Sequence, residues 1–222
     1  LLNVWKDEIP AEVFTETFTP PITDGSGNDR KNLLKAKEIL EKEGWFVEDG
    51  KLVKDGKEFK FEFLIVSPSD EKIALAYQSN LKKLGITMDV RTVDSSQYQE
   101  RLLSYDFDMI KRYWGVSLSP GNEQQFYWGS EVGQKDGSRN YPGINSPAVD
   151  ALIEKLISAT NREELTTAIH ALDRVLLWGH YVVPLYHSNK DRIAYWDFFE
   201  YPDEIPLYGI VIESWWINKD KQ

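Results

Sequence analysis

The sequence contains no cysteine among its 222 residues. This absence excludes a disulfide framework, a thiolate metal site and a cysteine nucleophile. The three histidines, His170, His180 and His187, have spacings that match no zinc motif, and no HExxH sequence occurs. Nucleotide-binding glycine motifs and the GxSxG nucleophile turn are also absent. We therefore predict a protein without a metal or a cofactor.

Basic residues are too few to balance the acidic ones. Lysine and arginine number 26 against 36 aspartates and glutamates, which gives a formal charge of −10. With this charge and no basic stripe, a nucleic-acid backbone is excluded as the partner. The sequence also shows no signal peptide and no apolar run of about twenty residues. Because it starts at Leu1 rather than at a methionine, we expect a processed or shortened chain.

The sequence does contain enough apolar residues for a core, and strand patterns alternate with helix patterns. Hydrophobic residues make up 41% of the chain, which suits one large domain or two small ones. The patterns predict first a helix over 31–43 that ends at Gly44, and then a hairpin formed by 52–53 and 59–65. A helix capped by Ser69 and closed by Gly85 follows, and after it a strand over 86–93. The last two elements are a helix that begins at Asp94 and a strand over 107–114. Connections of this length place the strands in a parallel α/β sheet with right-handed crossovers.

The segment from Arg112 to Ser130 follows the last of these predicted strands. It combines a turn rich in glycine, serine and proline with three amides, one carboxylate and several aromatic rings. Open α/β sheets bind ligands at loops that follow the carboxyl ends of strands, and such pockets combine aromatic surface with a few polar groups. We predict a ligand-binding loop here, the alternative being a polar loop over buried aromatics. The candidate ligand-binding residues are Arg112, Trp114, Ser119, Asn122, Glu123, Gln124, Tyr127 and Trp128.

The rest of the chain divides into a helical part and an irregular tail. Ser146-Pro147 and Thr160-Asn161 predict the starts of two helices that pack as a pair, the second ended by Gly179. Strand-like runs follow at Tyr181–His187 and Arg192–Trp196, without a helix between them. We therefore expect the tail to join a sheet in another part of the molecule.

Two carboxylates leave a hydrolase open as an alternative. Glu123 lies inside the predicted loop, and Asp106 precedes the strand that leads to it. A pair of carboxylates that flanks a bound substrate can catalyse hydrolysis. No activated nucleophile or metal motif accompanies them, so we do not predict an enzyme.

Motifs spread along the chain occur in the order found in a known family. They are the helix entry Gly143–Ile153, the run Asp173–Leu176 followed by Tyr181–Tyr186, and the step Asn80–Ile86. These motifs resemble the family 5 extracellular solute-binding proteins, the dipeptide and oligopeptide receptors of bacterial ABC importers. The stretches Pro10–Phe14, Thr23–Asn28 and Ser117–Gln124 resemble its Yej-type peptide-binding subgroup. The resemblance covers nearly the whole chain.

The resemblance implies a two-lobed receptor of which this chain is the C-terminal half. The implied fold is that of type II periplasmic binding proteins, with a mixed sheet flanked by helices. Residues 1–30 would be a lead-in from the first lobe, 31–182 the α/β substrate-binding lobe, and 183–222 crossover strands that return to the first lobe. The missing N-terminal lobe would carry the signal peptide, and the protein would lie in the periplasm and deliver its ligand to an inner-membrane ABC permease.

The resemblance also implies a role for one acidic side chain. Family receptors often hold the amino terminus of a peptide with an acidic residue in a loop after a strand that ends in Trp. Trp114 and Glu123 are the nearest matches, although Glu123 stands where an aspartate is usual. Oligopeptides or peptide-like compounds are therefore the expected ligands, and an oligosaccharide is the alternative because exposed Trp and Tyr also suit sugar faces.

Overall fold

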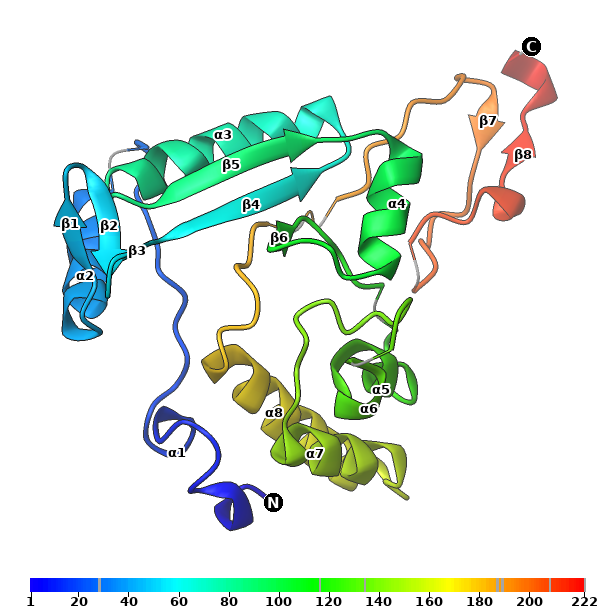
Figure 1. Cartoon of the computed structure of the whole chain (residues 1–222). Helices are drawn as coiled ribbons and strands as arrows, with labels where there is room; N and C mark the ends of the chain where they lie inside the picture. The colour runs from blue at the N-terminus through cyan, green and yellow to red at the C-terminus, as the bar shows by residue number, and fades with distance from the viewer. Residues whose placement is uncertain are drawn as a thin grey trace. The chain divides into compact units, whose positions relative to one another are not determined.

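The computed structural model describes residues 1–27, 29–115, 117–133, 135–186, 188, 190–207 and 209–221. The chain forms two compact units, Leu1–Tyr181 and Val182–Gln222. The first unit contains a parallel sheet, a small antiparallel sheet and several helices, and the second contains a two-stranded sheet (Figure 1). Within the described residues, no helix is long and apolar enough to cross a membrane.

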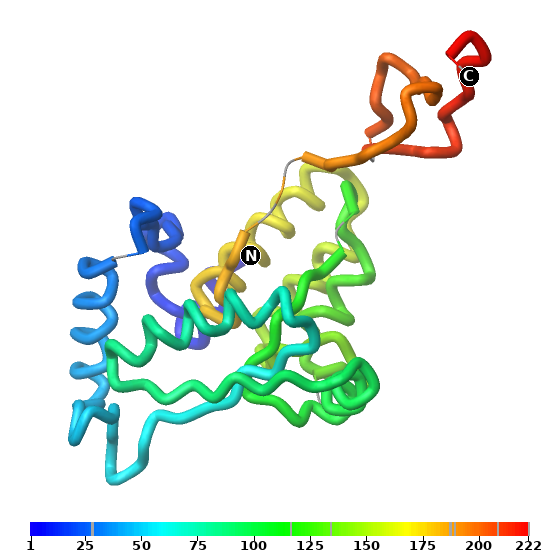
Figure 2. Tube along the Cα trace, turned by 90° about the horizontal axis from the view of Figure 1, so that it is seen from above, coloured from blue at the N-terminus to red at the C-terminus, as the bar shows by residue number. Residues whose placement is uncertain are grey.

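The central sheet is parallel and has the strand order β5-β4-β6. Its strands are β4 (Lys60–Ile65), β5 (Thr87–Thr92) and β6 (Met109–Ile110), connected by the helices α3 (Pro68–Lys82) and α4 (Ser95–Leu103). The helix α3 runs alongside β4 and β5 (Figure 2). This arrangement confirms the predicted α/β fold.

Successive side chains of β4 point to opposite faces of the sheet, and each face is covered by a different helix. Phe63 and Ile65 belong to the core under α3, whereas Leu64 packs with Tyr98 and Leu102 of α4. The chain moves from β4 to β5 on one side and then back past β4 to β6 on the other side. If both crossovers are right-handed, the connecting helices α3 and α4 must lie on opposite faces of the sheet. The sheet therefore has a point at which its strand order reverses, between β4 and β6.

Local signals explain where the helices of this sheet begin and end. Asp94 caps α4, as predicted, through two hydrogen bonds of 2.9 Å from backbone N–H groups. The cap of α3 is Ser67 rather than the predicted Ser69, because Pro68 occupies the first helical position. Gly85 closes α3 with a φ of +80°, as predicted.

The predicted hairpin lies earlier in the chain than its pattern indicates. The antiparallel sheet consists of β1 (Phe46–Glu48), β2 (Lys51–Lys54) and β3 (Lys57–Glu58), in that order. Most of the run 59–65 instead forms β4, whose last three residues are buried. A strand covered on both faces belongs in a parallel sheet, which is why this run leaves the hairpin.

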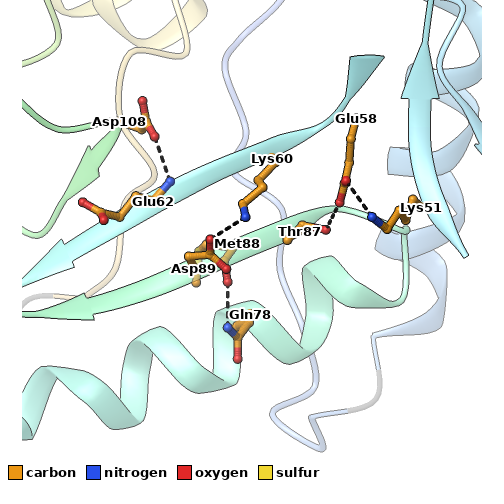
Figure 3. Close-up of polar contacts among 9 residues, drawn as sticks. All are labelled: Lys51, Glu58, Lys60, Glu62, Gln78, Thr87, Met88, Asp89 and Asp108. Atoms are coloured by element: carbon orange, nitrogen blue, oxygen red, sulfur yellow. Dashed lines mark hydrogen bonds and ion pairs between the residues drawn. The ribbon is translucent and has the colours of Figure 1, made fainter. Parts of the chain in front are cut away.

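Polar side chains link the two sheets of the first unit (Figure 3). The carboxylate of Glu58 accepts hydrogen bonds from the Thr87 hydroxyl at 2.5 Å and from Lys51 Nζ at 2.9 Å, so it joins β3 to β5 and β2. Across the central sheet, Lys60 Nζ lies 2.9 Å from Asp89 Oδ2. Lys60 is the first residue of β4, so this pair stands away from the carboxyl ends of the strands.

The first predicted helix forms α2 (Arg30–Lys42). The Asp29 side chain caps it by accepting a hydrogen bond from the backbone N–H of Asn32 at 3.3 Å. Gly44 follows its end with a φ of +83°, as predicted.

The largest core lies between α7 (Pro147–Ile157) and α8 (Arg162–Trp178). Both helices begin at caps within the predicted motifs, Ser146 and Asn161. The buried residues of this pair are Ala148, Val149, Leu152, Ile153, Leu156, Ala168, Ala171, Leu172 and Val175. The predicted helix pair is therefore confirmed.

The N-terminal segment is fastened to this helical core. It contains the 3₁₀ turn η1 (Asn3–Trp5) and the short helix α1 (Glu12–Thr15). Val13 is buried in the same core as α7 and α8. The guanidinium of Arg174 donates to the carbonyls of Val13 and Glu16, so it anchors the end of α1 to α8.

The second unit contains little regular structure among its described residues. Its strands are β7 (Phe199–Glu200) and β8 (Trp216–Ile217), which pair antiparallel, and it also contains the 3₁₀ turns η2 (Ile212–Ser214) and η3 (Lys219–Lys221). The described residues of the runs Tyr181–His187 and Arg192–Trp196 have no regular structure in this chain, and His187 lies outside those residues. Their pairing with strands of an absent lobe stays a prediction. Strands need neighbouring strands as partners for their backbone groups, and neither run pairs with a strand in the part of the chain that the structure describes.

Candidate ligand-binding site

The candidate segment leaves the sheet beside the point at which the strand order reverses. β4 and β6 are parallel neighbours, so their carboxyl ends lie side by side (Figure 1). Ligands of open α/β sheets bind in the crevice outside such a reversal. The strand predicted over 107–114 is only Met109–Ile110, because the chain leaves the sheet at Lys111 to reach an aromatic group outside it.

Part of the predicted loop is helical. Glu123–Trp128 forms α5 and Ser130–Gly133 forms α6. Helices this short show no full apolar period, so the sequence pattern did not reveal them. Gly129 separates the two helices, and a Cβ there would lie 2.6 Å from the Gln125 carbonyl oxygen. Only glycine permits this close turn.

Aromatic rings gather at the centre of the segment. The rings of Trp114 and Trp128 have centroids 5.0 Å apart at an interplanar angle of 38°, and Tyr141 lies 6.5 Å from Trp114. Tyr127 is buried, and its hydroxyl donates to the carbonyl of Gly115 at 3.3 Å. We refer to Trp114, Tyr127, Trp128 and Tyr141 as the aromatic cluster. Tyr141 was not among the predicted residues because it lies beyond the predicted segment, which ends at Ser130.

A chain of polar contacts runs through α5 to the same cluster. Glu123 Oε1 accepts hydrogen bonds from the backbone N–H of Gly121 at 2.9 Å and from the Gln124 amide at 3.3 Å. Gln124 Oε1 in turn accepts one from Trp128 Nε1 at 3.0 Å. Burial alone would raise the pKa of Glu123, but hydrogen bonds from Gly121, from its own N–H and from Gln124 outweigh burial and lower that pKa. Glu123 is therefore held as a carboxylate.

Arg112 presents a cation at the edge of the cluster. Its Nη2 donates to the Tyr141 hydroxyl at 2.9 Å, and its guanidinium carbon lies 4.9 Å from the centroid of that ring. Tyr113, which was not among the predicted residues, is 89% exposed. Ser119 and Asn122 are exposed as well. Within the described residues, their side chains make no hydrogen bond to the other six predicted residues.

A buried amide ties the segment to α7. Asn140 has no exposed surface, and its Nδ2 donates to the carbonyls of Gly129 at 3.0 Å and Ile144 at 2.9 Å. Its Oδ1 accepts from the backbone N–H of Ile144 at 2.9 Å. Asn140 therefore links the turn after α5 to the entry of α7. Over the described ranges, no group of three or more His, Asp or Glu side chains is placed to hold a metal ion.

Comparison with known proteins identifies the family. The family model of the bacterial extracellular solute-binding proteins, family 5 (middle part), matches residues 6–136. The chain belongs to this family. The family 5 assignment confirms the resemblance that the sequence motifs carried, from the step Asn80–Ile86 to the stretch Ser117–Gln124.

Relatives of the chain are similar along almost all of it. It is 49% identical over 218 residues to protein y4wM of Sinorhizobium fredii, with 97% of this chain and 33% of the relative covered. It is 41% identical over 222 residues to the probable peptide-binding protein YejA of Agrobacterium fabrum, with 99% and 36% covered. The chain thus spans about a third of the length of the curated relatives it matches.

A solved structure supports the fold. The oligopeptide-binding protein AppA of Bacillus subtilis, in complex with a nonapeptide, matches with a TM-score of 0.61 and 25% identity. The match covers 76% of this chain and 33% of AppA. The first unit therefore has the fold of part of a type II periplasmic binding protein, as the motifs implied.

Proposed function

We propose that this chain is the C-terminal part of the substrate-binding component of a bacterial ABC importer for oligopeptides or peptide-like compounds. The observation that carries the proposal is the position of the aromatic cluster and of its charged neighbours, Arg112 and Glu123. They follow β6 at the reversal of the strand order, where such folds take ligands. The peptide-binding description of YejA and the nonapeptide bound to AppA support the ligand class.

The side chains at this site suit a ligand with a polar backbone and variable side groups. Glu123 supplies a fixed negative charge, and the exposed Arg112 supplies a positive one. Tyr113 adds an exposed ring for contact. The rings of Trp114 and Trp128 pack against each other at an interplanar angle of 38°, and a ring that already packs on another has less surface left for a sugar. These features favour a peptide over an oligosaccharide.

The two carboxylates considered for catalysis, Glu123 and Asp106, favour binding instead. A general acid for hydrolysis needs a raised pKa, whereas the pKa of Glu123 is lowered. The carboxylate of Asp106 forms an ion pair with Arg101, with Nε and Oδ2 2.8 Å apart. Both acids are thus engaged in structural contacts, and we propose a receptor rather than a hydrolase.

The second unit supports a larger receptor. Among its described residues none is buried, and Trp196, Leu207 and Ile212 are each more than 70% exposed. About forty residues without a core are too few to be stable alone. We therefore propose that residues 183–222 complete a first lobe formed by the missing N-terminal part of the protein. Ligand would bind between the lobes, in the periplasm, for transfer to an inner-membrane permease.

The test is a thermal-shift titration of the chain with a mixed nonapeptide library and, in parallel, with a mixture of oligosaccharides. We expect the peptides alone to raise the unfolding temperature with concentration, since a ligand that binds only the folded state stabilises it by mass action. Glu123→Gln keeps the hydrogen-bond acceptor but removes the charge, and should reduce the shift. Glu131→Gln is the matched control, because Glu131 is an exposed acid of the neighbouring helix α6.

The competing functions have their own signatures in the same experiment. A temperature shift with oligosaccharides and none with peptides would assign the site to sugars. Shortened peptides in the mass spectrum of the incubated library would make the protein a hydrolase. If peptides raise the unfolding temperature of Glu123→Gln as much as that of the unsubstituted chain, Glu123 does not contact the ligand, although the protein still binds peptides.

A further inference from the structure

An ion pair lies where the candidate segment leaves the central sheet. Lys111 is the first residue after β6, and its Nζ pairs with Oδ1 of Asp70 in the first turn of α3. Since α3 follows β4, the pair joins the chain ends that leave two neighbouring parallel strands. This is the reversal point of the sheet, beside the proposed ligand site.

The environment makes this pair stronger than an ordinary surface pair. The side chains of Lys111 and Asp70 are 28% and 15% exposed, whereas those of Lys60 and Asp89 on the same sheet are 54% and 56% exposed. Exposed pairs contribute little because water and salt screen them, and partial burial reduces that screening. Removing the charge of Asp70 would leave the Lys111 ammonium partly desolvated and unpaired.

Contacts on either side of Lys111 transmit its position to the site. The Tyr98 hydroxyl of α4 donates to the carbonyl of Lys111 at 3.3 Å, and the next residue, Arg112, bonds Tyr141. Trp114 follows two residues later. Its Nε1 is buried and has no acceptor among the described residues, unlike Trp128 Nε1, which bonds Gln124. The position of the Trp114 ring is therefore set by its packing against Trp128 and by the path of the backbone after β6.

We propose that Asp70 is a positioning residue of the ligand site. By holding Lys111 against α3, it sets the direction in which the chain leaves β6. That direction brings Trp114 onto Trp128 and Arg112 onto Tyr141. The proposal deepens the proposed function and rests on it for the ligand, but its structural part can be tested without any ligand.

The first measurement is the near-ultraviolet circular dichroism of the Trp114–Trp128 pair, taken as the difference between the chain and Trp114→Phe. We expect Asp70→Asn to abolish most of this signal and Asp70→Glu, which keeps the charge, to restore it. Asp89→Asn is the matched control, because it removes one carboxylate of an ion pair from the same sheet, and its partner Lys60 lies at the start of β4 (Figure 3). It should leave the signal unchanged.

The second measurement is the affinity for the mixed nonapeptide library. We expect Asp70→Asn to bind about tenfold more weakly, a typical coupling between linked sites, and Asp89→Asn to bind normally. A full Trp114–Trp128 signal in Asp70→Asn, or an equal loss in Asp89→Asn, would overturn the proposal. If Asp70→Asn does not fold, Lys111→Met decides, since it removes the same pair and should lose the same signal. Absence of peptide binding in the unsubstituted chain would count against the proposed function alone.

Discussion

At the residue scale, one buried amide side chain links the candidate segment to the helix that follows it. The side chain of Asn140 is fully buried and makes three hydrogen bonds with the backbone of Gly129 and Ile144. Gly133 leaves room for it, since a Cβ there would lie 2.5 Å from Asn140 Nδ2. A buried backbone carbonyl or N–H without a partner is costly, so this amide stabilises both the end of α5 and the start of α7.

Asn140→Ala should therefore destabilise the chain by about 2–4 kcal/mol, from three lost hydrogen bonds and the buried groups left unpaired. The measurement is the free energy of unfolding in urea, followed by the far-ultraviolet circular dichroism of the helices. Asn145→Ala, at an exposed asparagine close in the sequence, should change the free energy of unfolding by less than about 0.5 kcal/mol. Equal effects at the two positions would show that the amide of Asn140 is dispensable.

At the element scale, close approaches of backbone decide where strands and helices meet. Gly85 ends α3 and also lies against β2, where the backbone N–H of Leu52 donates to the Gly85 carbonyl at 2.7 Å. A Cβ on Gly85 would lie 2.9 Å from that nitrogen. The same glycine therefore closes a helix of one sheet and contacts a strand of the other.

Gly85→Ala should destabilise the chain by more than Gly50→Ala. Both glycines have a φ of +80°, so both substitutions cost about 1–2 kcal/mol of backbone strain. Only Gly85 adds a clash, because a Cβ on Gly50, in the turn between β1 and β2, meets no atom within 4 Å. Urea unfolding of the two variants measures the difference, and identical midpoints would rule out a packing role for Gly85.

At the scale of the whole molecule, the two units differ in what they bury. The three cores formed by the described residues lie in the first unit, and the last residue in any of them is Trp178. The second unit has ring contacts of its own, such as Tyr195 with Trp215 at 5.0 Å, but no buried residue among those described. The stability of the chain should therefore come from the first unit.

A chain that ends at Tyr181 should unfold at the same urea concentration as the whole chain. The measurement is urea unfolding, monitored by the circular dichroism of the helices. A chain that ends at Thr160 is the control, because it lacks α8 and with it Ala168, Leu172 and Val175 of the largest core. That control should fail to fold. A large loss of stability in the first truncation would mean that residues 182–222 help to form the core of the first unit.

The sequence by itself determined the features that depend on neighbouring residues. Asp94, Ser146 and Asn161 cap helices, Gly44 and Gly85 end them, and the order of strand and helix patterns predicts a parallel sheet. These signals are readable because a cap or a turn acts within a few residues of the chain. The family motifs were readable for the same reason, as short runs in a constant order.

Only the tertiary structure decided which distant side chains converge on the site. Tyr141, Asn140 and Asp70 lie outside the predicted segment, yet they contact Arg112, Gly129 and Lys111. No local pattern encodes such contacts, because they depend on how the sheet brings separate strand ends together. The strand over 107–114 was predicted too long and the helix α5 was not predicted, because the chain between them leads to the Trp114–Trp128 contact, which no local pattern encodes.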